Sequence, residues 1–288
     1  MSERQRTLAG SVELKGIGVH SGAESTVRLL PAEADRGIVF RRIDLEDQPE
    51  IPADLDHVSD TRLGTSLAAG DAEVLTVEHL LAGLASRYVD NAIVEIDGPE
   101  PPIRDGSFRD FVDAVTDTGT MELDAEASIL KVSDVVHVQA GSGVSYVCTP
   151  HAGYRISTTI DFDHPAIGRQ YASFDFGFGS FSEQVAPART FGFKEDAEAL
   201  RERGRALGAS LDNTIVLDAS GVLNDGGLRF DDEFVRHKIG DLVGDLALLG
   251  ARLRGHVVAE RPSHEGNVAL ARELVEHARK GRAPIVDA

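Results

Sequence analysis

Residues 235–245 read VRHKIGDLVGD and lie inside a longer apolar segment. His237, Asp241 and Asp245 are each four residues apart, so a helix would place all three side chains on one face. A histidine and an aspartate at this spacing can form half of a metal site, or an ion pair on an exposed polar face. The flanking positions are apolar, so we expect the stripe to border the core, where charged groups need partners or a metal.

Composition and charge limit the class of protein. The chain has 288 residues, of which 42% are hydrophobic and 27% charged, as is typical of a globular protein with one or two domains. Its net charge of -19 and the lack of a basic stripe argue against a nucleic-acid partner. A cysteine-rich zinc cluster and an intrachain disulfide are excluded because Cys148 is the single cysteine, which fits a reducing cytoplasm.

Targeting signals are not visible either. The first stretch, MSERQRTLAGSVELKG, lacks the apolar core of a secretory signal peptide. No stretch approaches the about 18 apolar residues of a membrane span. We therefore expect a cytoplasmic protein without a transmembrane segment, and we expect a monomer.

Hydrophobic patterns predict two successive series of strands and helices. In the first series GIVFRRIDL and NAIVEIDG predict strands, while TVEHLLAGLASRY, with Thr76 as N-cap, and SFRDFVDAVTDTG predict helices. A new strand series starts with ILKVSDVVHVQ, so we expect domains at 1–126 and 127–288. The second series contains a charged helix (KEDAEALRERGRALG), the longest helix (DDEFVRHKIGDLVGDLALLGARLRG) and a last helix (EGNVALARELVEHARK).

The two series contain a pair of segments with a weak similarity to each other. TVEHLLAGLASRYVDNAIVEID and FVRHKIGDLVGDLALLGARLRGHVVAE are both helix-then-strand units with a histidine early in the helix. Two related α+β domains would bring these helices together at a pseudo-symmetric interface, although chance also produces such units.

Three further residues are candidates for chemistry. Glu78 and His79 stand at the start of a predicted helix, where the N-terminus favours an anion and a neutral histidine. This suits a carboxylate base beside a histidine ligand, or Glu78 is simply a favourable first-turn residue. His264 lies in a turn before the last helix, as a proton donor at a cleft or as a polar loop residue. The other histidines show no useful spacing and are interpreted as structural or surface residues: His57, His137, His164, His256 and His277.

Taken together, nine motifs resemble the UDP-3-O-acyl-N-acetylglucosamine deacetylase family. They run in order from about Arg4 to about His277: KGIGVHSG, DTRLGTSL, TVEHLLAGL, PPIRDGS, TIDFDHPAIG, ARTFGF, SLDNTIVLD, VLNDGGLRFDDEFVRHKIGDLVGD and SHEGNVAL. The resemblance implies an α+β fold of two related domains, each a β-sheet layered with α-helices, with the active site at their interface. It also implies hydrolysis of the N-acetyl group of UDP-3-O-acyl-N-acetylglucosamine to acetate and UDP-3-O-acyl-glucosamine, the committed step of lipid A biosynthesis.

The resemblance further implies roles for individual residues. A zinc ion, with ferrous iron as the alternative, would be bound by His79, His237 and Asp241. Glu78 would be the general base and His264 the general acid. Asp245 would orient His264, and Thr190 would help to hold the oxyanion.

Substrate contacts follow from the same resemblance. Lys238 would face the nucleotide diphosphate. The insert of residues 191–213 would wall a passage for the acyl chain, whereas its pattern alone favours an amphipathic surface helix. The residues assigned to this passage are Phe191, Phe193, Leu200 and Leu207.

Two positions depart from the family pattern. Ser263 stands where the family has a glycine before the catalytic histidine, and Gly64 stands where it often has a cysteine. Two other functions fit part of this pattern: a zinc amidohydrolase or peptidase with another substrate, and a non-catalytic sugar-nucleotide binder. The intact set of candidate groups argues against the binder.

Overall fold

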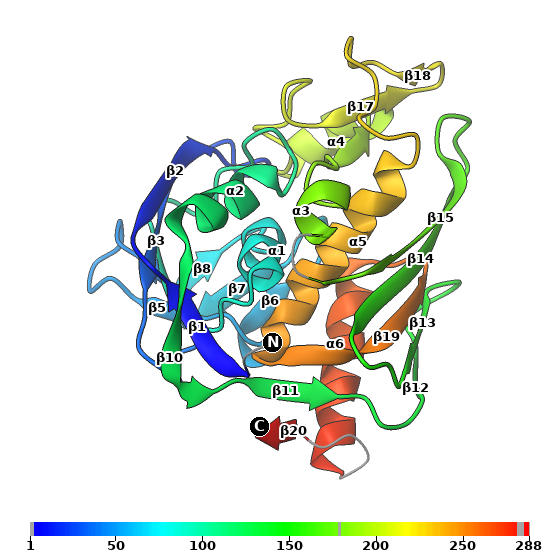
Figure 1. Cartoon of the computed structure of the whole chain (residues 1–288). Helices are drawn as coiled ribbons and strands as arrows, with labels where there is room; N and C mark the ends of the chain where they lie inside the picture. Colours follow the sequence, from blue (N-terminus) through cyan, green and yellow to red (C-terminus); the bar gives the residue numbers. More distant parts are fainter. Residues whose placement is uncertain (1–2, 178–179, 281–284, 288) are drawn as a thin grey trace.

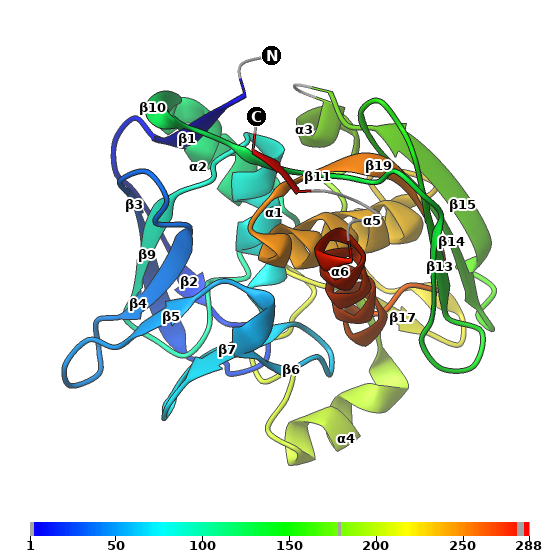
Figure 2. The same ribbon diagram turned by 90° about the horizontal axis from the view of Figure 1, so that it is seen from below.

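Two β-sheets enclose a central layer of helices in the computed structural model, which describes residues 3–177, 180–280 and 285–287. The helices of this layer are α1 (Glu78–Ser86), α5 (Glu233–Leu246) and α6 (His264–Arg279). Figures 1 and 2 show the layer between a sheet built from the N-terminal half of the chain and a sheet built from the C-terminal half. The expected α+β fold, with sheet and helices in both halves, is confirmed.

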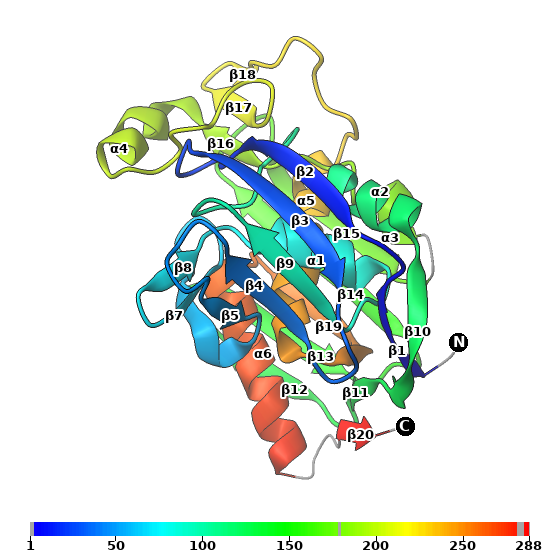
Figure 3. The same ribbon diagram turned by 90° about the vertical axis from the view of Figure 1, so that its left-hand side faces the viewer.

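The N-terminal half is built around a five-stranded sheet in the order β2-β3-β9-β4-β5, which faces the viewer in Figure 3. Its strands are β2 (Val12–Ile17), β3 (Glu24–Pro31), β4 (Ile38–Arg42), β5 (Glu50–Pro52) and β9 (Ala92–Ile96). Only β4 and β9 of this sheet run parallel. The core beneath it contains the apolar side chains of α1 and of α2 (Arg109–Thr118), which ends at Gly119 with a positive φ of 77°.

Smaller elements complete this half. A three-stranded sheet follows the turn η1 (Leu55–His57) and consists of β6 (Val58–Asp60), β7 (Ser66–Ala69) and β8 (Ala72–Val74). The first strand, β1 (Arg4–Leu8), pairs antiparallel with β10 (Thr120–Glu126).

The C-terminal half is built around β19 (Arg252–Glu260), which pairs with β11, β13 and β14 in a seven-stranded sheet. The other strands are β11 (Ser128–Lys131), β12 (Val136–Gln139), β13 (Ser145–Thr149), β14 (Tyr154–Phe162), β15 (Gly168–Asp175) and β20 (Ile285–Asp287). A short helix, α3 (Ser180–Gln184), precedes the insert, and η3 (Ala247–Leu249) follows α5.

The insert extends beyond these layers at the top of Figure 1. It contains β16 (Phe191–Phe193), η2 (Lys194–Asp196) and α4 (Ala197–Glu202), and β16 pairs with β17 (Ile215–Asp218) and, through it, with β18 (Gly221–Val222). The helix expected from KEDAEALRERGRALG is therefore much shorter than its charged pattern suggested.

Two glycines of α5 explain how the central helices come together. A Cβ atom on Gly244 would lie 2.0 Å from the backbone oxygen of Glu78 at the start of α1. A Cβ atom on Gly240 would lie 2.2 Å from Cε2 of Phe108. Both positions need glycine because any side chain would collide with a neighbour. The sequence KIGDLVGD thus lets α1 and Phe108 approach α5 closely.

Two expectations about helices are wrong. Thr76 does not cap α1, since it has a positive φ of 52° and its hydroxyl donates to Glu100 instead. The N-cap position of α1 is Val77, which makes no side-chain cap hydrogen bond. The segment expected to form the longest helix forms α5 with 14 residues, and the apolar residues that follow it form η3. Among the described residues the longest helix is therefore α6, with 16 residues. No helix in the described ranges is long and apolar enough to cross a membrane.

Candidate functional site

Three buried side chains from two helices meet in the centre of the molecule. His79 comes from α1, and His237 and Asp241 come from α5 one turn apart. One ligand atom of each residue lies within 4.8 Å of the others. Oδ1 of Asp241 is 3.3 Å from Nε2 of His237 and 3.8 Å from Nε2 of His79. The structure thus gathers the three residues that the resemblance assigns to a metal.

Neighbouring groups fix the orientation of these rings. Nδ1 of His237 lies 3.1 Å from the backbone oxygen of Ala188 and must donate to it, which leaves Nε2 free to bind a metal. The Phe108 ring packs against both imidazoles, at centroid distances of 4.5 Å to His79 and 5.0 Å to His237. Gly240 makes room for this ring, so the glycine contributes to the site indirectly.

The charge state of the three groups suits a divalent cation. Burial lowers the pKa of His79 to about 3 and also lowers the pKa of His237, so both rings are neutral and can offer a lone pair. Burial opposes ionisation of Asp241, but His237 and Lys238 outweigh it and hold its pKa below the usual range. Oδ1 of Asp241 is buried without a hydrogen-bond partner among the described residues. A carboxylate oxygen without a hydrogen-bond donor, placed between two neutral imidazoles, is a donor set that fits a divalent metal ion.

A second buried group lies next to the first. Glu78 from α1, Asp245 from α5 and His264, the first residue of α6, bring their ligand atoms within 4.8 Å of one another. Nδ1 of His264 lies 2.9 Å from Oδ2 of Asp245, and Nε2 of His264 lies 4.0 Å from Oε1 of Glu78. The imidazole therefore has one nitrogen held by a carboxylate while the other faces a second carboxylate.

Burial and neighbouring charges together raise the pKa values of Glu78 and His264. Burial raises the pKa of Glu78 to about 7, assisted by the nearby carboxylates of Asp245 and Asp241. Burial alone would lower the pKa of His264, but Asp245 and Glu78 outweigh it and raise the pKa to about 9. Around pH 8, Glu78 is thus largely ionised while His264 is largely protonated.

The residues on either side of Thr190 approach His237. Ala188 accepts the hydrogen bond from His237, and the Phe191 ring lies 6.3 Å from the His237 ring. Thr190 itself is held by its backbone, since its N–H donates to Gly106 and its carbonyl accepts from Ile215. The preceding Arg189 pairs with the fully buried Glu233 at the start of α5.

Of the residues expected to contact substrate, Lys238 touches the first group directly and the others belong to the insert. Nζ of Lys238 donates to Oδ2 of Asp241 at 2.8 Å, and the side chain also borders a cavity of about 330 Å³ that Arg261 lines. In the insert, Phe193 packs on His164 at 5.6 Å. Leu200 is half-buried on α4 and Leu207 is 50% exposed.

The two departures from the family pattern have simple structural effects. Ser263 is the N-cap of α6, where its hydroxyl accepts from the backbone N–H of Gly266 at 3.2 Å. A Cβ atom on Gly64 would lie 3.1 Å from Oε1 of Glu78, so glycine leaves space beside that carboxylate.

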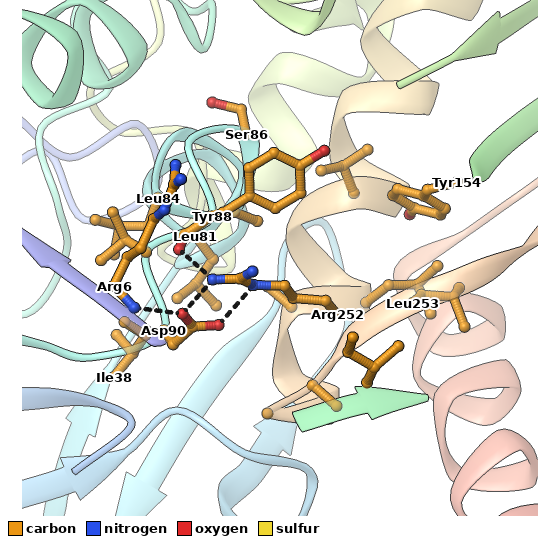
Figure 4. Close-up of a pocket in the computed structure, with 18 of the residues that line it drawn as sticks. Arg6, Ile38, Leu81, Leu84, Ser86, Tyr88, Asp90, Tyr154, Arg252 and Leu253 are labelled. Carbon is orange, nitrogen blue, oxygen red and sulfur yellow. Dashed lines mark hydrogen bonds and ion pairs between the residues drawn. The ribbon is translucent and has the colours of Figure 1, made fainter. Parts of the chain in front are cut away.

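A larger cavity, about 590 Å³, lies elsewhere between the two halves. Figure 4 shows it beside the ion pair of Arg252 and Asp90, with apolar walls that include Leu81, Leu84 and Leu253. None of the residues of the two buried groups lines it. Cavity size alone would therefore have pointed away from the titratable groups.

Sequence reasoning missed Thr65 and Asn267. Both are fully buried, and both donate a side-chain hydrogen bond to the carboxylate of Asp245. Each lies in one of the motifs of the family resemblance, DTRLGTSL or SHEGNVAL. A threonine or an asparagine, however, gives no indication in the sequence of a hydrogen-bond partner that is far away along the chain.

Comparisons with known proteins agree with the geometry. A family model described as UDP-3-O-acyl N-acetylglycosamine deacetylase (LpxC) matches residues 5–276. A protein named UDP-3-O-acyl-N-acetylglucosamine deacetylase from Geotalea uraniireducens is 45% identical over 274 residues, which cover 95% of this chain and 89% of the relative. Proteins of the same name from Myxococcus xanthus (45% identity, 95% of this chain, 87% of the relative) and Citrifermentans bemidjiense (46%, 94% and 89%) are similarly close.

Proposed function

Because the chain belongs to the UDP-3-O-acyl N-acetylglycosamine deacetylase family, we propose that it hydrolyses the N-acetyl group of UDP-3-O-acyl-N-acetylglucosamine. The products are acetate and UDP-3-O-acyl-glucosamine, and the reaction is the committed step of lipid A biosynthesis. The observation that carries this proposal is the pair of adjacent buried groups, one suited to a metal and one to proton transfer.

We propose that His79, His237 and Asp241 hold the metal ion. Two imidazole nitrogens and one carboxylate oxygen suit zinc, and they also suit ferrous iron. When bound, the ion would polarise the amide carbonyl and make water a better nucleophile near neutral pH.

The residues of the second group would move the protons. Glu78 accepts a proton from the attacking water, whose oxygen bonds to the acetyl carbon. His264 then donates its Nε2 proton to the sugar nitrogen as the C–N bond breaks, so that a neutral amine leaves. Asp245 holds Nδ1 of His264 and thereby directs Nε2 toward Glu78 and the reacting atoms. Thr190 assists by donating a hydrogen bond to the oxyanion.

Substrate recognition is assigned to two regions beside the site. Lys238, together with Arg261 in the wall of the smaller cavity, supplies positive charge for the diphosphate of the nucleotide. The insert supplies apolar contacts for the acyl chain, through Phe191, Phe193, Leu200 and Leu207. The aromatic cluster around Phe191, which includes Phe162 and Phe234, supports an apolar path that starts near His237.

We also propose a domain boundary between residues 126 and 127 and a cytoplasmic location. Two hydrophobic cores support the boundary, since one draws mainly on residues before it and the other mainly on residues after it. The site residues Glu78 and His79 come from one side of this boundary, and His237, Asp241, Asp245 and His264 come from the other.

Release of acetate from the UDP-acyl-sugar tests the function directly. The purified protein should release one acetate per substrate, lose this activity on chelation and recover it with one equivalent of Zn²⁺ or Fe²⁺. Activity on simple N-acetyl amides or peptides but not on the UDP-acyl-sugar would identify a different hydrolase. Tight binding without acetate release would identify a sugar-nucleotide binder.

Metal analysis tests the ligand assignment independently. Wild-type protein should contain about one ion per chain, as expected of a set of three protein ligands with one open position. The His79→Ala, His237→Ala double variant should contain almost none. A His57→Ala, His277→Ala double variant serves as the control, since neither histidine belongs to the gathered group. Undiminished metal in the first variant would show that the ion binds elsewhere.

A further inference from the structure

Thr65 connects Glu78 and Asp245, the two carboxylates of the buried group that also contains His264. Its backbone N–H donates to Oε2 of Glu78 at 2.9 Å, and its hydroxyl donates to Oδ1 of Asp245 at 2.6 Å. Its carbonyl accepts from the N–H of Val77, directly before α1. We propose that Thr65 is a positioning residue for the proposed deacetylation: it fixes the Asp245 carboxylate against His264 and ties this pair to Glu78.

The hydrogen bonds of Asp245 show why Thr65 matters. Oδ2 accepts from His264 at 2.9 Å and from Nδ2 of Asn267 at 2.8 Å. Asn267 is held in turn by the hydroxyl of Tyr146. Oδ1 accepts from Thr65, and Asp245, Thr65 and Asn267 are all fully buried. The carboxylate is therefore clamped at both oxygens, and losing the Thr65 hydroxyl frees one side of a group whose terminal torsion is soft.

The position of Thr65 in the fold makes the connection specific. Thr65 directly precedes β7 in the N-terminal half, whereas Asp245 lies on α5, 180 residues later. Its backbone is bonded to the start of α1 and its side chain to α5. The distance of 4.0 Å between Glu78 and Nε2 of His264 is thus set through one residue. Thr65 acts through Asp245 and Glu78 and is not itself a catalytic residue.

Replacement of Thr65 by valine isolates the hydroxyl. Valine keeps the shape of threonine and its backbone N–H, so the bond to Glu78 remains. It also leaves unchanged every charged or titratable group that faces His264 from the helices and the β2–β3 turn: Glu78, His79, Lys238, His237, Asp241, Asp245 and His20.

Steady-state kinetics of the zinc-loaded protein give the first test. Thr65→Val should lower kcat by about 10- to 100-fold, as is usual when a group that orients a functional side chain is lost, with KM nearly unchanged. Thr65→Ser, which restores a hydroxyl, should recover most of kcat. The control Thr116→Val removes a hydroxyl that donates within α2, to Val112, and should leave kcat unchanged.

A double-variant comparison separates positioning from general loss of structure. In an Asp245→Ala background, Thr65→Val should cost little more, because the oxygen that accepts from the Thr65 hydroxyl is already gone. Thr65→Val should bind metal as the wild type does, and it should remain folded at the assay temperature although the loss of a donor to the buried Asp245 lowers its unfolding midpoint. The proposal is wrong if Thr65→Val keeps full kcat, if Thr65→Ser is as slow as Thr65→Val, or if the Thr65→Val loss is undiminished in the Asp245→Ala background.

An NMR measurement tests the same contact without any turnover. In ¹⁵N-histidine-labelled, zinc-loaded protein, the Nδ1 proton of His264 should give a downfield, slowly exchanging resonance that is absent in His264→Gln. It should move upfield or vanish in Thr65→Val and return in Thr65→Ser. An unchanged resonance in Thr65→Val would overturn the proposal even if deacetylation is confirmed. A shifted resonance in a protein that releases no acetate would support Thr65 and reject the proposed function.

Discussion

Glu78 and His264 are both able to transfer protons, and their surroundings assign them opposite charge states. Burial raises the pKa of Glu78 to about 7, and Asp245 and Glu78 overcome burial to raise that of His264 to about 9. A base must be deprotonated and an acid protonated. Both conditions hold between these two values, and a cation bound at His79 would extend the range downward by stabilising the Glu78 carboxylate.

The pH profile of kcat/KM should therefore be bell-shaped. The rate rises as Glu78 loses its proton and falls as His264 loses its proton. Glu78→Ala should abolish the acidic limb and His264→Ala the basic limb, each with a loss of about 10²- to 10⁴-fold in rate. Metal content should be retained in both variants. Loss of the acidic limb in His264→Ala would reverse the two roles.

Within α5, Gly240 makes room for the ring that packs against the two histidines proposed to bind the metal. A Cβ atom there would meet Cε2 of Phe108 at 2.2 Å, and Phe108 packs on both His79 and His237. Gly240→Ala should therefore lower stability by about 1–3 kcal/mol through overpacking, and it should weaken metal binding. Urea unfolding and metal titration measure the two effects.

Gly226→Ala is the matched control for this prediction, because a Cβ atom at Gly226 meets no atom within 4 Å. Its stability and metal affinity should stay near those of the wild type. Equal behaviour of the two variants would mean that Phe108 adapts to the extra methyl group without disturbing the imidazoles.

The insert can be tested through α4. Leu200 is half-buried there, and a tryptophan would narrow an acyl passage along the helix. Leu200→Trp should reduce kcat/KM for long-acyl substrates at least about 10-fold, the effect of a loss of about 1.4 kcal/mol of binding. A UDP-sugar without the acyl group should be affected much less. Arg201→Trp, at an exposed position of α4, controls for bulk on the surface. Equal losses with both substrates would favour the surface-helix interpretation.

Across the whole molecule, Arg252 and Asp90 join the two halves. The guanidinium of Arg252 on β19 donates to both oxygens of Asp90 at 3.0 and 2.6 Å, beside the larger cavity in Figure 4. Both side chains are more than four-fifths buried. Arg252→Met removes the cation and leaves Asp90 with the backbone N–H of Arg6 as a donor, so it should cost about 3 kcal/mol in the free energy of unfolding.

Arg254→Met is the control, because Arg254 on the same strand pairs with Glu3 in an exposed ion pair. It should cost about 0–1 kcal/mol. Urea denaturation of the two variants checks the difference. A small and equal cost would show that the Arg252 pair does not hold the halves together.

The sequence by itself determined the two series of strands and helices and the stripe of His237, Asp241 and Asp245, and the family resemblance implied the α+β class. The series and the stripe follow from spacing along the chain, since side chains four residues apart share one face of a helix wherever that helix packs. The family resemblance then supplied partners from elsewhere, such as His79 and His264. Local patterns were less reliable at helix ends. The hydroxyl of Thr76 donates to Glu100 instead of capping α1, and the apolar residues after α5 form η3.

Only the tertiary structure decided which distant groups touch. Thr65 and Asp245 are 180 residues apart, and Asp90 and Arg252 are 162 apart, so no periodic pattern connects them. The need for glycine at 240 and 244 likewise arises from Phe108 and from the backbone of Glu78, which belong to other segments. Such contacts are fixed by how the sheets and helices pack, because packing selects the neighbours of each face while the local sequence selects only the face.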